Sequence, residues 1–245
     1  MGKYSFPDAS LLIVDDENFS RITVLRLLKN LGDPKTESAT NGLEAFTILE
    51  QRAQYVDCVI ADFNMPVMHG LQLLKRIRTG ASDIPRNMPV IMLTGHGDTC
   101  LVNLAIELDV NTFILKPATA DALGQRLSQI LIMDKDDESW IKSVEDYEQI
   151  DVDTPIVDIL KKNAKTQVKI KSPKPEKPEP QEYTTESVQY RLGDLKEWMQ
   201  LAKTVSGPTG QVFIRAGTNL SRKHIEQLKG LLEMKLIEDA IFIKK

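Results

Sequence analysis

The sequence Leu11-Leu12-Ile13-Val14-Asp15-Asp16-Glu17 joins four apolar residues to three consecutive carboxylates. A short run that is apolar at every position is typical of a strand buried on both faces of a parallel sheet. Ligands of such sheets bind beside the carboxyl ends of the strands. The segment therefore predicts a buried strand with an acidic site at its end.

The same pattern recurs through the first 133 residues. Amphipathic segments with helical spacing separate further apolar runs, which lie at residues 36–39, 58–61, 90–93 and 112–115, the first of these weaker than the others. Alternation of short apolar strands with helices is typical of the α/β class. We therefore predict a doubly wound α/β domain over residues 1–133, with a five-stranded parallel sheet.

The composition is that of an ordinary globular protein. The chain has 245 residues, of which 42% are hydrophobic and 27% charged, so one or two domains are expected. No apolar run reaches the ~18 residues that a membrane span needs, and residues 1–10 lack the features of a secretory signal. Cys58 and Cys100 are therefore expected to be free thiols, and three histidines are too few for a multi-histidine metal centre.

Residues 134–182 differ from the first segment and carry a net charge of −4. Apolar residues at helical spacing predict a short helix around residues 140–147. A second is predicted after Thr154-Pro155, where the threonine caps and the proline opens the helix. Residues 171–182 contain four prolines and no large apolar side chain, which predicts an extended segment. We therefore place a helical and proline-rich linker at residues 134–182.

Residues 183–245 predict a small α+β module. Apolar spacing indicates a helix over residues 192–202, a second helix that begins at Ser221, and strands at residues 211–215 and 240–243. A module of this size buries a marginal core, so a partner protein or a homodimer is expected to complete it. Its net charge of +3 is too small for the clustered basic stripe of a nucleic-acid-binding domain.

Polar residues follow four of the predicted strands. Asp15 and Asp16 follow the first, Asp62 the third, Thr94 the fourth and Lys116 the fifth. Parallel strands end at one edge of the sheet, so these groups should converge. A cluster of carboxylates attracts a hard cation such as Mg²⁺, and a lysine and a hydroxyl can hold phosphoryl oxygens. A remaining carboxylate can act as the nucleophile, so this edge predicts phosphoryl transfer to an aspartate.

Four motifs occur in order, namely LLIVDDE, ADFNMPVMHG, IMLTGHGD and FILKPAT. They resemble the receiver domain of two-component response regulators, in particular the chemotaxis-regulator type, and the resemblance covers residues 8–133. It implies a flavodoxin-like fold and a bound Mg²⁺. It also implies a domain that catalyses only its own phosphorylation and dephosphorylation.

The resemblance implies a role for each residue of the acidic site. Asp62 would be the phosphoacceptor, and Mg²⁺ would be held by Asp15, Asp16, Asp62 and the backbone carbonyl of Asn64. His69 departs from the pattern, because many receivers carry an acid at this position. We interpret it as a surface loop residue.

Further positions would read the phosphoryl group. Thr94 and Lys116 would contact it, and Thr94 would act as a switch together with Phe113, which lies three residues before the lysine. Asn64 and His96 occupy the positions that tune the lifetime of the phosphoryl group in this family. The resemblance thus implies a domain that can be phosphorylated.

The resemblance implies a cytoplasmic response regulator that accepts its phosphoryl group from a histidine kinase or a phosphotransfer protein. The sequence lacks GGDEF, EAL and P-loop motifs and a His-Asp dipeptide, so no enzymatic output is expected. Two other outputs stay open. A protein–protein module that acts on an effector protein is favoured, and a DNA-binding regulator that reads DNA through the helix after Ser221 is the alternative.

Overall fold

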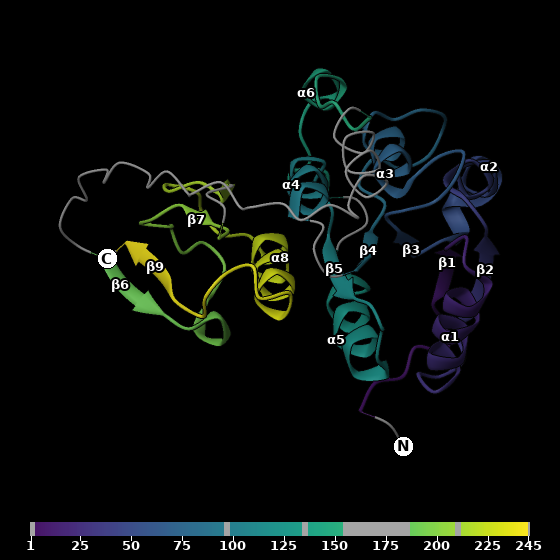
Figure 1. Cartoon of the computed structure of the whole chain (residues 1–245), viewed down its shortest axis with the longest axis horizontal. Coiled ribbons are helices and arrows are strands. Elements are labelled where there is room, and N and C mark those ends of the chain that lie inside the picture. Colours follow the sequence, from purple (N-terminus) through teal and green to yellow (C-terminus); the bar gives the residue numbers. More distant parts are fainter. Residues whose placement is uncertain (1–2, 96–98, 134–136, 154–186, 209–211, 245) are drawn as a thin grey trace, which may run out of the picture. The chain divides into compact units, whose positions relative to one another are not determined.

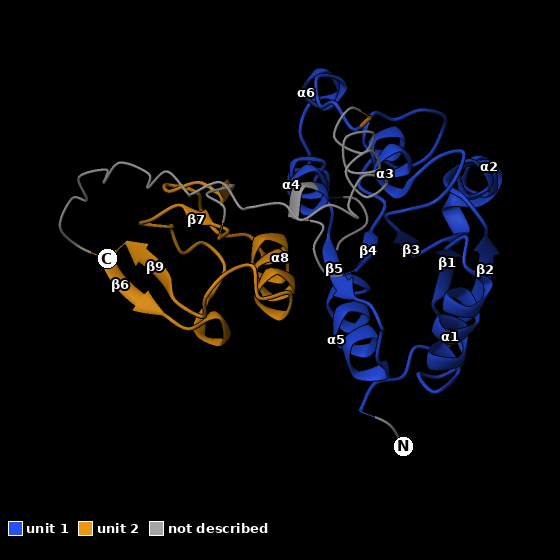
Figure 2. Ribbon diagram, viewed as in Figure 1, with its two compact units in different colours: residues 1–152 blue, residues 153–245 orange. Residues whose placement is uncertain are grey.

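The computed structural model describes residues 3–95, 99–133, 137–153, 187–208 and 212–244. The chain divides into two compact units, Met1–Val152 and Asp153–Lys245 (Figure 2). The helix predicted after Thr154 and the proline-rich residues 171–182 lie outside the described residues. Among the residues that are described, no helix is long and apolar enough to cross a membrane.

The first unit is built on a five-stranded sheet in the order β2-β1-β3-β4-β5 (Figure 1). All neighbouring strands are parallel. The predicted doubly wound α/β fold is confirmed, and the weak run at residues 36–39 belongs to the edge strand. The strands are β1 (Ser10–Val14), β2 (Lys35–Ala39), β3 (Cys58–Asp62), β4 (Val90–Thr94) and β5 (Thr112–Leu115).

Helices cover both faces of this sheet, as Figure 1 shows. Helices α1 and α5 lie on one face, and α2, α3 and α4 lie on the other. Each helix connects two successive strands or follows the last one, so every strand ends at the same edge. The helices are α1 (Asn18–Lys29), α2 (Gly42–Arg52), α3 (Gly70–Arg78), α4 (Thr99–Glu107) and α5 (Ala120–Ile130), with a 3₁₀ turn, η1 (Ala53–Tyr55), after α2.

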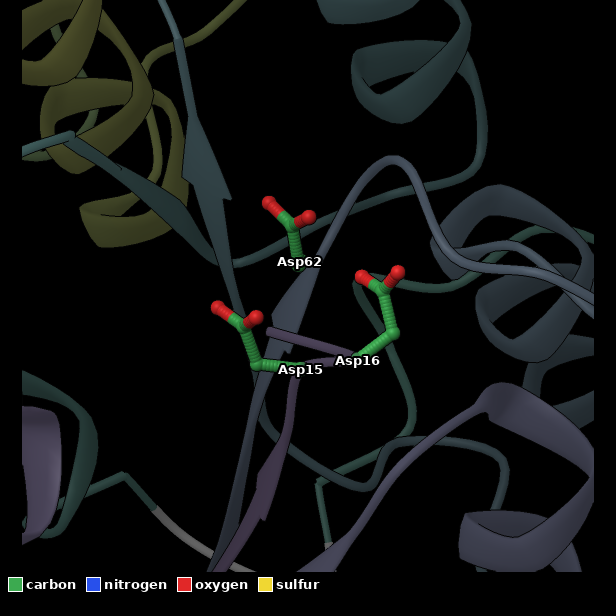
Figure 3. Close-up of side chains that lie close together, drawn as sticks. All are labelled: Asp15, Asp16 and Asp62. Carbon is green, nitrogen blue, oxygen red and sulfur yellow. The ribbon is translucent and has the colours of Figure 1, made fainter. Parts of the chain in front are cut away.

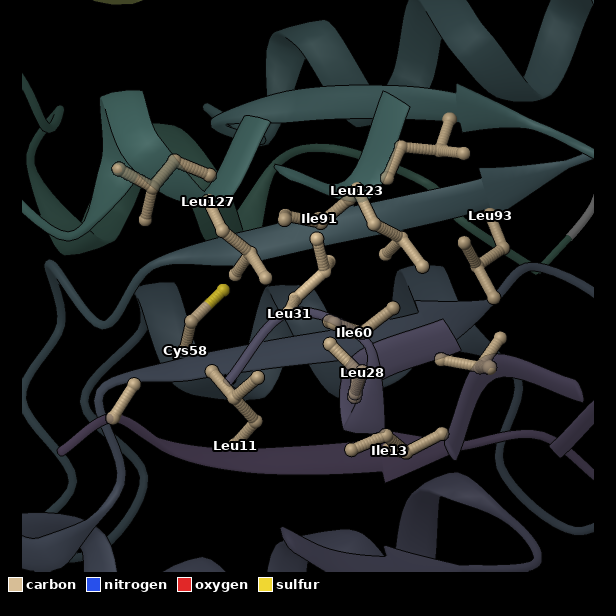
Figure 4. Close-up of a cluster of buried hydrophobic side chains, with 14 residues drawn as sticks. Leu11, Ile13, Leu28, Leu31, Cys58, Ile60, Ile91, Leu93, Leu123 and Leu127 are labelled. Carbon is tan, nitrogen blue, oxygen red and sulfur yellow. The ribbon is translucent and has the colours of Figure 1, made fainter. Parts of the chain in front are cut away.

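Alternate residues of the central strands fill two apolar layers. Leu11 and Ile13 of β1 belong to a buried cluster with residues of α1 and α5 (Figure 4). Leu12 and Val14 are equally buried and point to the opposite face, because successive strand residues alternate. Cys58 is a free thiol in the first layer, as predicted, and its burial raises its pKa. Burial on both faces explains why these strands are apolar at every position.

The first unit continues beyond the sheet. A short helix, α6 (Val144–Glu148), follows α5. It covers the second half of the helix predicted around residues 140–147, whereas Trp140 lies in a turn before it. Ser143 caps this helix by accepting a hydrogen bond from the backbone amide of Asp146. Residues 137–152, named here the C-terminal arm, are part of the first unit.

The second unit has two small antiparallel sheets and, among its described residues, one α-helix. Ser221 caps that helix by accepting a hydrogen bond from the amide of His224, as the sequence predicts. The predicted α+β class of this module is confirmed. The sheets pair β6 (Ser187–Tyr190) with β9 (Ile241–Lys244) and β7 (Val205–Ser206) with β8 (Val212–Ile214), and the helix is α8 (Arg222–Glu233).

The helix predicted over residues 192–202 is wrong. Only a 3₁₀ turn, η2 (Leu192–Asp194), forms there, and Gln200 and Leu201 form antiparallel bridges instead. Trp198 has a φ of 71° and is 82% exposed. A residue in the left-handed conformation cannot continue a right-handed helix. The segment is therefore irregular, although its apolar residues have helical spacing.

Candidate functional site

The acidic site lies at the carboxyl edge of the parallel sheet. Asp15 and Asp16 directly follow β1, and Asp62 is the last residue of β3. One ligand oxygen from each of the three carboxylates lies within 4.8 Å of the others. Figure 3 shows the three side chains grouped at the ends of these strands. The register pairs Val14 with Ala61, so neighbouring strands end level and bring the carboxylates together.

Lys116 binds two of these carboxylates. Its Nζ lies 2.8 Å from Asp62 Oδ1 and 2.9 Å from Asp15 Oδ2. Burial alone would lower the pKa of Lys116, but its hydrogen bonds with Asp62 and Asp15 raise the pKa above the usual value. The lysine is therefore a permanent positive charge beside the carboxylates.

Within the acidic site, Asp62 is the carboxylate with a raised pKa. Burial raises the pKa of Asp62 to about 6, and the charge of Asp15 adds to the increase, although Lys116 opposes it. Burial disfavours the charged form of a carboxylate, and a nearby positive charge favours it. Additional positive charge at this position, such as a divalent cation, would favour the ionised form of Asp62.

This shift predicts a stability difference in metal-free buffer. The pKa of Asp62 rises from its ordinary value of ~4 to about 6 on folding. The favourable contribution of its protonated form is therefore complete below pH ~4 and is lost as the pH rises through 6. Asparagine does not ionise, so Asp62→Asn should raise the free energy of unfolding by ~2–3 kcal/mol at pH 8 and by almost nothing at pH 4. Urea titrations in EDTA measure this difference, and an equal effect at both pH values would contradict it.

The start of α1 holds Asp15 in place. Ser20 Oγ donates to Asp15 Oδ2 at 2.5 Å, and the backbone amide of Glu17 donates to Asp15 Oδ1 at 2.9 Å. Arg21 reaches back to the backbone carbonyl of Asp15 at 2.7 Å. Neither Ser20 nor Arg21 was among the residues predicted for the site. Their position could have indicated the contact, because the first turn of a helix that starts directly after the strand lies close to the end of that strand.

We expect Ser20→Ala to weaken Mg²⁺ binding by about tenfold, because a metal-ligating carboxylate depends on the hydrogen bonds that orient it. Titration calorimetry with MgCl₂ measures this loss. The matched control is Ser128→Ala on α5, where the hydroxyl bonds only the carbonyl of Gln125 among the contacts seen in the structure. Equal Mg²⁺ affinities for the two variants would contradict the role of Ser20.

The loop from β3 to α3 passes very close to Asp62. A Cβ atom on Gly70 would lie 2.2 Å from the backbone oxygen of Asp62, so only glycine fits at this position. The interpretation of His69 as a surface loop residue is wrong. His69 is half-buried and caps α3, because its Nδ1 accepts from the amide of Gln72 while the Gln72 side chain accepts from the amide of His69. The cap fixes the start of α3 beside the acidic site.

The remaining site residues surround the carboxylates at different depths. Thr94 ends β4, is buried, and donates its hydroxyl to the carbonyl of Gly95 at 3.1 Å. Phe113 is fully buried and stacks on Phe63, with ring centroids 6.4 Å apart. Asn64 is exposed two residues after Asp62, and His96 lies outside the described residues. The ring of Phe113 thus already occupies an inward position in this structure.

The donor set fits a hard divalent cation. Asp15, Asp16 and Asp62 offer only oxygen atoms, and Asp16 is exposed whereas Asp15 is fully buried. Mg²⁺ binds proteins through one or a few carboxylates and retains several water molecules. One exposed and two buried carboxylates leave room for those waters, so the residues present are suited to Mg²⁺.

Comparisons with known proteins agree with this geometry. Residues 11–128 match the family model described as the response regulator receiver domain. The chain is 36% identical over 121 residues to a chemotaxis protein CheY homolog of Campylobacter jejuni, a match that covers 49% of this chain and 91% of that protein. It is 38% identical over 120 residues to chemotaxis protein CheY-3 of Vibrio cholerae, covering 49% of this chain and 89% of the other.

Solved structures also match about half of this chain. A response regulator receiver domain protein from Clostridium thermocellum is 30% identical, with a TM-score of 0.46, and covers 50% of this chain and 94% of the other. CheY in a CheX-CheY-BeF3-Mg complex from Borrelia burgdorferi is 27% identical, with a TM-score of 0.46, and covers 51% of this chain and 90% of the other.

The fold and the site are those of a signalling receiver domain, with three carboxylates and a lysine at the carboxyl edge of a parallel five-stranded sheet. The chain belongs to the response regulator receiver family, with a CheY-like receiver domain in its first half. Its receiver domain supports phosphorylation-dependent signalling in two-component systems. The C-terminal arm and the second unit lie beyond the residues that the family model matches.

Proposed function

We propose that this chain is a response regulator that accepts a phosphoryl group on Asp62 from a histidine kinase or a phosphotransfer protein. The observation that carries the proposal is the position of Lys116 Nζ, 2.8 Å from Asp62 and 2.9 Å from Asp15, beside a cluster of three carboxylates. No separate catalytic partner within the chain is required, because the receiver assembles the groups for its own phosphorylation and dephosphorylation.

The transfer joins Asp62 to the phosphorus of the donor. A carboxylate oxygen of Asp62 attacks the phosphorus, an O–P bond forms, and the N–P bond of the phosphohistidine breaks with its electron pair returning to the imidazole nitrogen. Lys116 neutralises charge on the phosphoryl oxygens, and the Thr94 hydroxyl bonds one of them. Asp15, Asp16, Asp62 and the backbone carbonyl of Asn64 would hold Mg²⁺, which would supply positive charge to the transferring group when bound.

Thr94 and Phe113 read the result. Thr94 now donates to the carbonyl of Gly95, and a phosphoryl oxygen would compete for this hydroxyl. Phe113 lies on the neighbouring strand β5 and stacks on Phe63, the residue after Asp62. Phe113 therefore packs against the residue that follows the reacting carboxylate, and we expect phosphorylation of Asp62 to alter the packing of the two rings. Asn64 and His96 tune how long the phosphoryl group lasts.

The output is a protein–protein module at residues 183–245. Residues 134–182 join it to the receiver, and the C-terminal arm within them packs on the first unit. The module's net charge of +3 is too small for the clustered basic stripe of a nucleic-acid-binding domain. Trp198, 82% exposed, offers a large apolar contact to an effector protein or to a second copy. Because the proposed donor is a histidine kinase or a phosphotransfer protein, we propose that the protein acts in the cytoplasm.

Intact-mass measurement tests phosphoryl acceptance. The full chain incubated with acetyl phosphate should gain one phosphoryl group in Mg²⁺ and none in EDTA. No gain under either condition would overturn the proposed function of the receiver.

A salt series tests the output. The full chain with beryllofluoride, a phosphoryl mimic, is titrated against labelled genomic DNA fragments. The proposed protein–protein output predicts only weak binding that disappears with increasing salt. Sequence-specific binding that survives moderate salt would establish the DNA-binding alternative.

A further inference from the structure

The C-terminal arm is attached to the receiver by a dense set of polar contacts. Lys75 Nζ on α3 donates to the backbone carbonyls of Glu148 at 3.0 Å and Ile150 at 2.7 Å. Arg86 donates to the backbone carbonyl of Lys142 at 2.6 Å. In all three contacts the acceptor is a backbone carbonyl of the arm. The contacts therefore fix the backbone of the arm on the receiver surface.

Asp109 is the centre of the attachment. This residue lies in the turn between α4 and β5, with a φ of 55°, and is buried. Its Oδ2 accepts from the hydroxyl of Tyr147 at 2.6 Å and from Lys142 Nζ at 2.9 Å. Lys142 Nζ also donates to the carbonyl of Glu107, the last residue of α4, at 2.6 Å. The arm therefore holds both the end of α4 and the turn that follows.

The aromatic residues of the arm pack against basic side chains. Tyr147 is fully buried. Burial, followed by its hydrogen bond to Asp109, raises the pKa of the phenol, so Tyr147 stays protonated at neutral pH and donates that hydrogen bond. Trp140 lies over the guanidinium of Arg78 at 5.0 Å. An arm with a fully buried tyrosine is a packed element of the domain and not a passive tether.

The turn that the arm holds is joined to the strands of the acidic site. Asn111 exchanges two hydrogen bonds with Val90, the first residue of β4: its amide donates to the Val90 carbonyl at 3.1 Å, and its Oδ1 accepts from the Val90 amide at 2.8 Å. β4 ends at Thr94, and β5 leads to Lys116. The arm is thus connected, through the α4–β5 turn, to the beginning of β4 and β5. The carboxyl ends of these two strands carry Thr94 and Lys116.

We propose that the C-terminal arm is an intramolecular clamp on the end of α4 and the α4–β5 turn, and that it transmits the state of the acidic site to the chain beyond Asp153. The coupling rests on the proposed phosphorylation of Asp62. A change in β4 and β5 reaches Asp109, alters its bonds to Tyr147 and Lys142, and loosens or tightens the arm. Thermodynamic reciprocity requires that loosening the arm also changes the affinity of the site for a phosphoryl mimic.

Hydrogen exchange of the full chain, with and without beryllofluoride and Mg²⁺, tests this proposal. We expect the amides of residues 144–150 to change their exchange rate by about fivefold with the mimic. Tyr147→Phe removes a buried hydrogen bond, so arm exchange should rise about tenfold without the mimic and no longer respond to it. The matched control is Tyr55→Phe, because Tyr55 is 68% exposed on η1, and it should behave as the wild type.

The outcomes separate the clamp from the proposed function. A response in β4 without any response in the arm would overturn the clamp and leave phosphorylation of Asp62 standing. No response in either segment would overturn both. Lys142→Met is the second variant if Tyr147→Phe unfolds the domain, because it removes the ion pair to Asp109 and keeps the buried ring. Its arm exchange must also rise and lose its response to the mimic, and an arm like that of the wild type would overturn the clamp.

Discussion

Asp62→Asn should abolish magnesium-dependent phosphoryl incorporation. Asparagine keeps the size of the side chain but lacks the nucleophilic carboxylate oxygen, so no aspartyl phosphate can form at the end of β3. The measurement is intact-mass analysis after incubation with acetyl phosphate and Mg²⁺, in which the wild type gains one phosphoryl group and the variant gains none.

The control for this loss is Asp33→Asn. Asp33 is exposed just before β2, at the opposite end of the strands, and its φ of 55° is one that asparagine tolerates. This variant should be labelled like the wild type. Full labelling of Asp62→Asn would contradict the assignment of the phosphoacceptor. The urea titration of Asp62→Asn at pH 8 checks that the variant is folded where labelling is lost.

Arg78→Met should destabilise the receiver more than any surface substitution, by ~3–5 kcal/mol. The Arg78 guanidinium is fully buried and donates to the carbonyls of Arg86, Met88 and Asp109 and to the side chain of Asn111. Burial lowers the pKa of Arg78 to about 10, so it is still charged at neutral pH. Methionine fills the space but leaves these acceptors without their donor.

Urea unfolding at pH 7 measures the loss. Arg76→Met is the matched control, since Arg76 is two residues away on α3 but exposed, with a ring contact to Phe46 at 5.0 Å. The control should lose no more than ~1 kcal/mol. Similar losses for the two variants would show that the buried hydrogen bonds of Arg78 do not stabilise the domain as inferred.

The sheet and the acidic site could be predicted because both depend on short stretches of sequence. The strands β1, β3, β4 and β5 are largely apolar because they are buried on both faces, and each polar group of the site lies at the end of one of them or directly after it. Asp15 and Lys116 are far apart in the sequence, yet their 2.9 Å contact follows from parallel strands that end at one edge. The apolar pattern of the strands, and the rule that parallel strands end at one edge, were sufficient to predict the sheet and the acidic site.

Other features depend on contacts that no local pattern encodes. The hydroxyl of Tyr147 meets Asp109 across 38 positions of the chain, and neither residue is distinctive in its own segment. Ser20 is an ordinary helix residue until its hydroxyl is seen to reach Asp15. The helix expected over residues 192–202 failed for the same reason, because apolar spacing does not reveal that Trp198 takes a left-handed conformation and points outward.

The central claim is that Asp62 carries the phosphoryl group, and borohydride trapping tests it most directly. Borohydride reduces an aspartyl phosphate to homoserine, which leaves a permanent mark that peptide mass spectrometry can locate. The wild-type chain treated with acetyl phosphate and Mg²⁺ and then reduced should contain homoserine at position 62 and nowhere else. Homoserine at Asp15 or Asp16, or none at position 62 in a chain that has gained a phosphoryl group, would contradict the account.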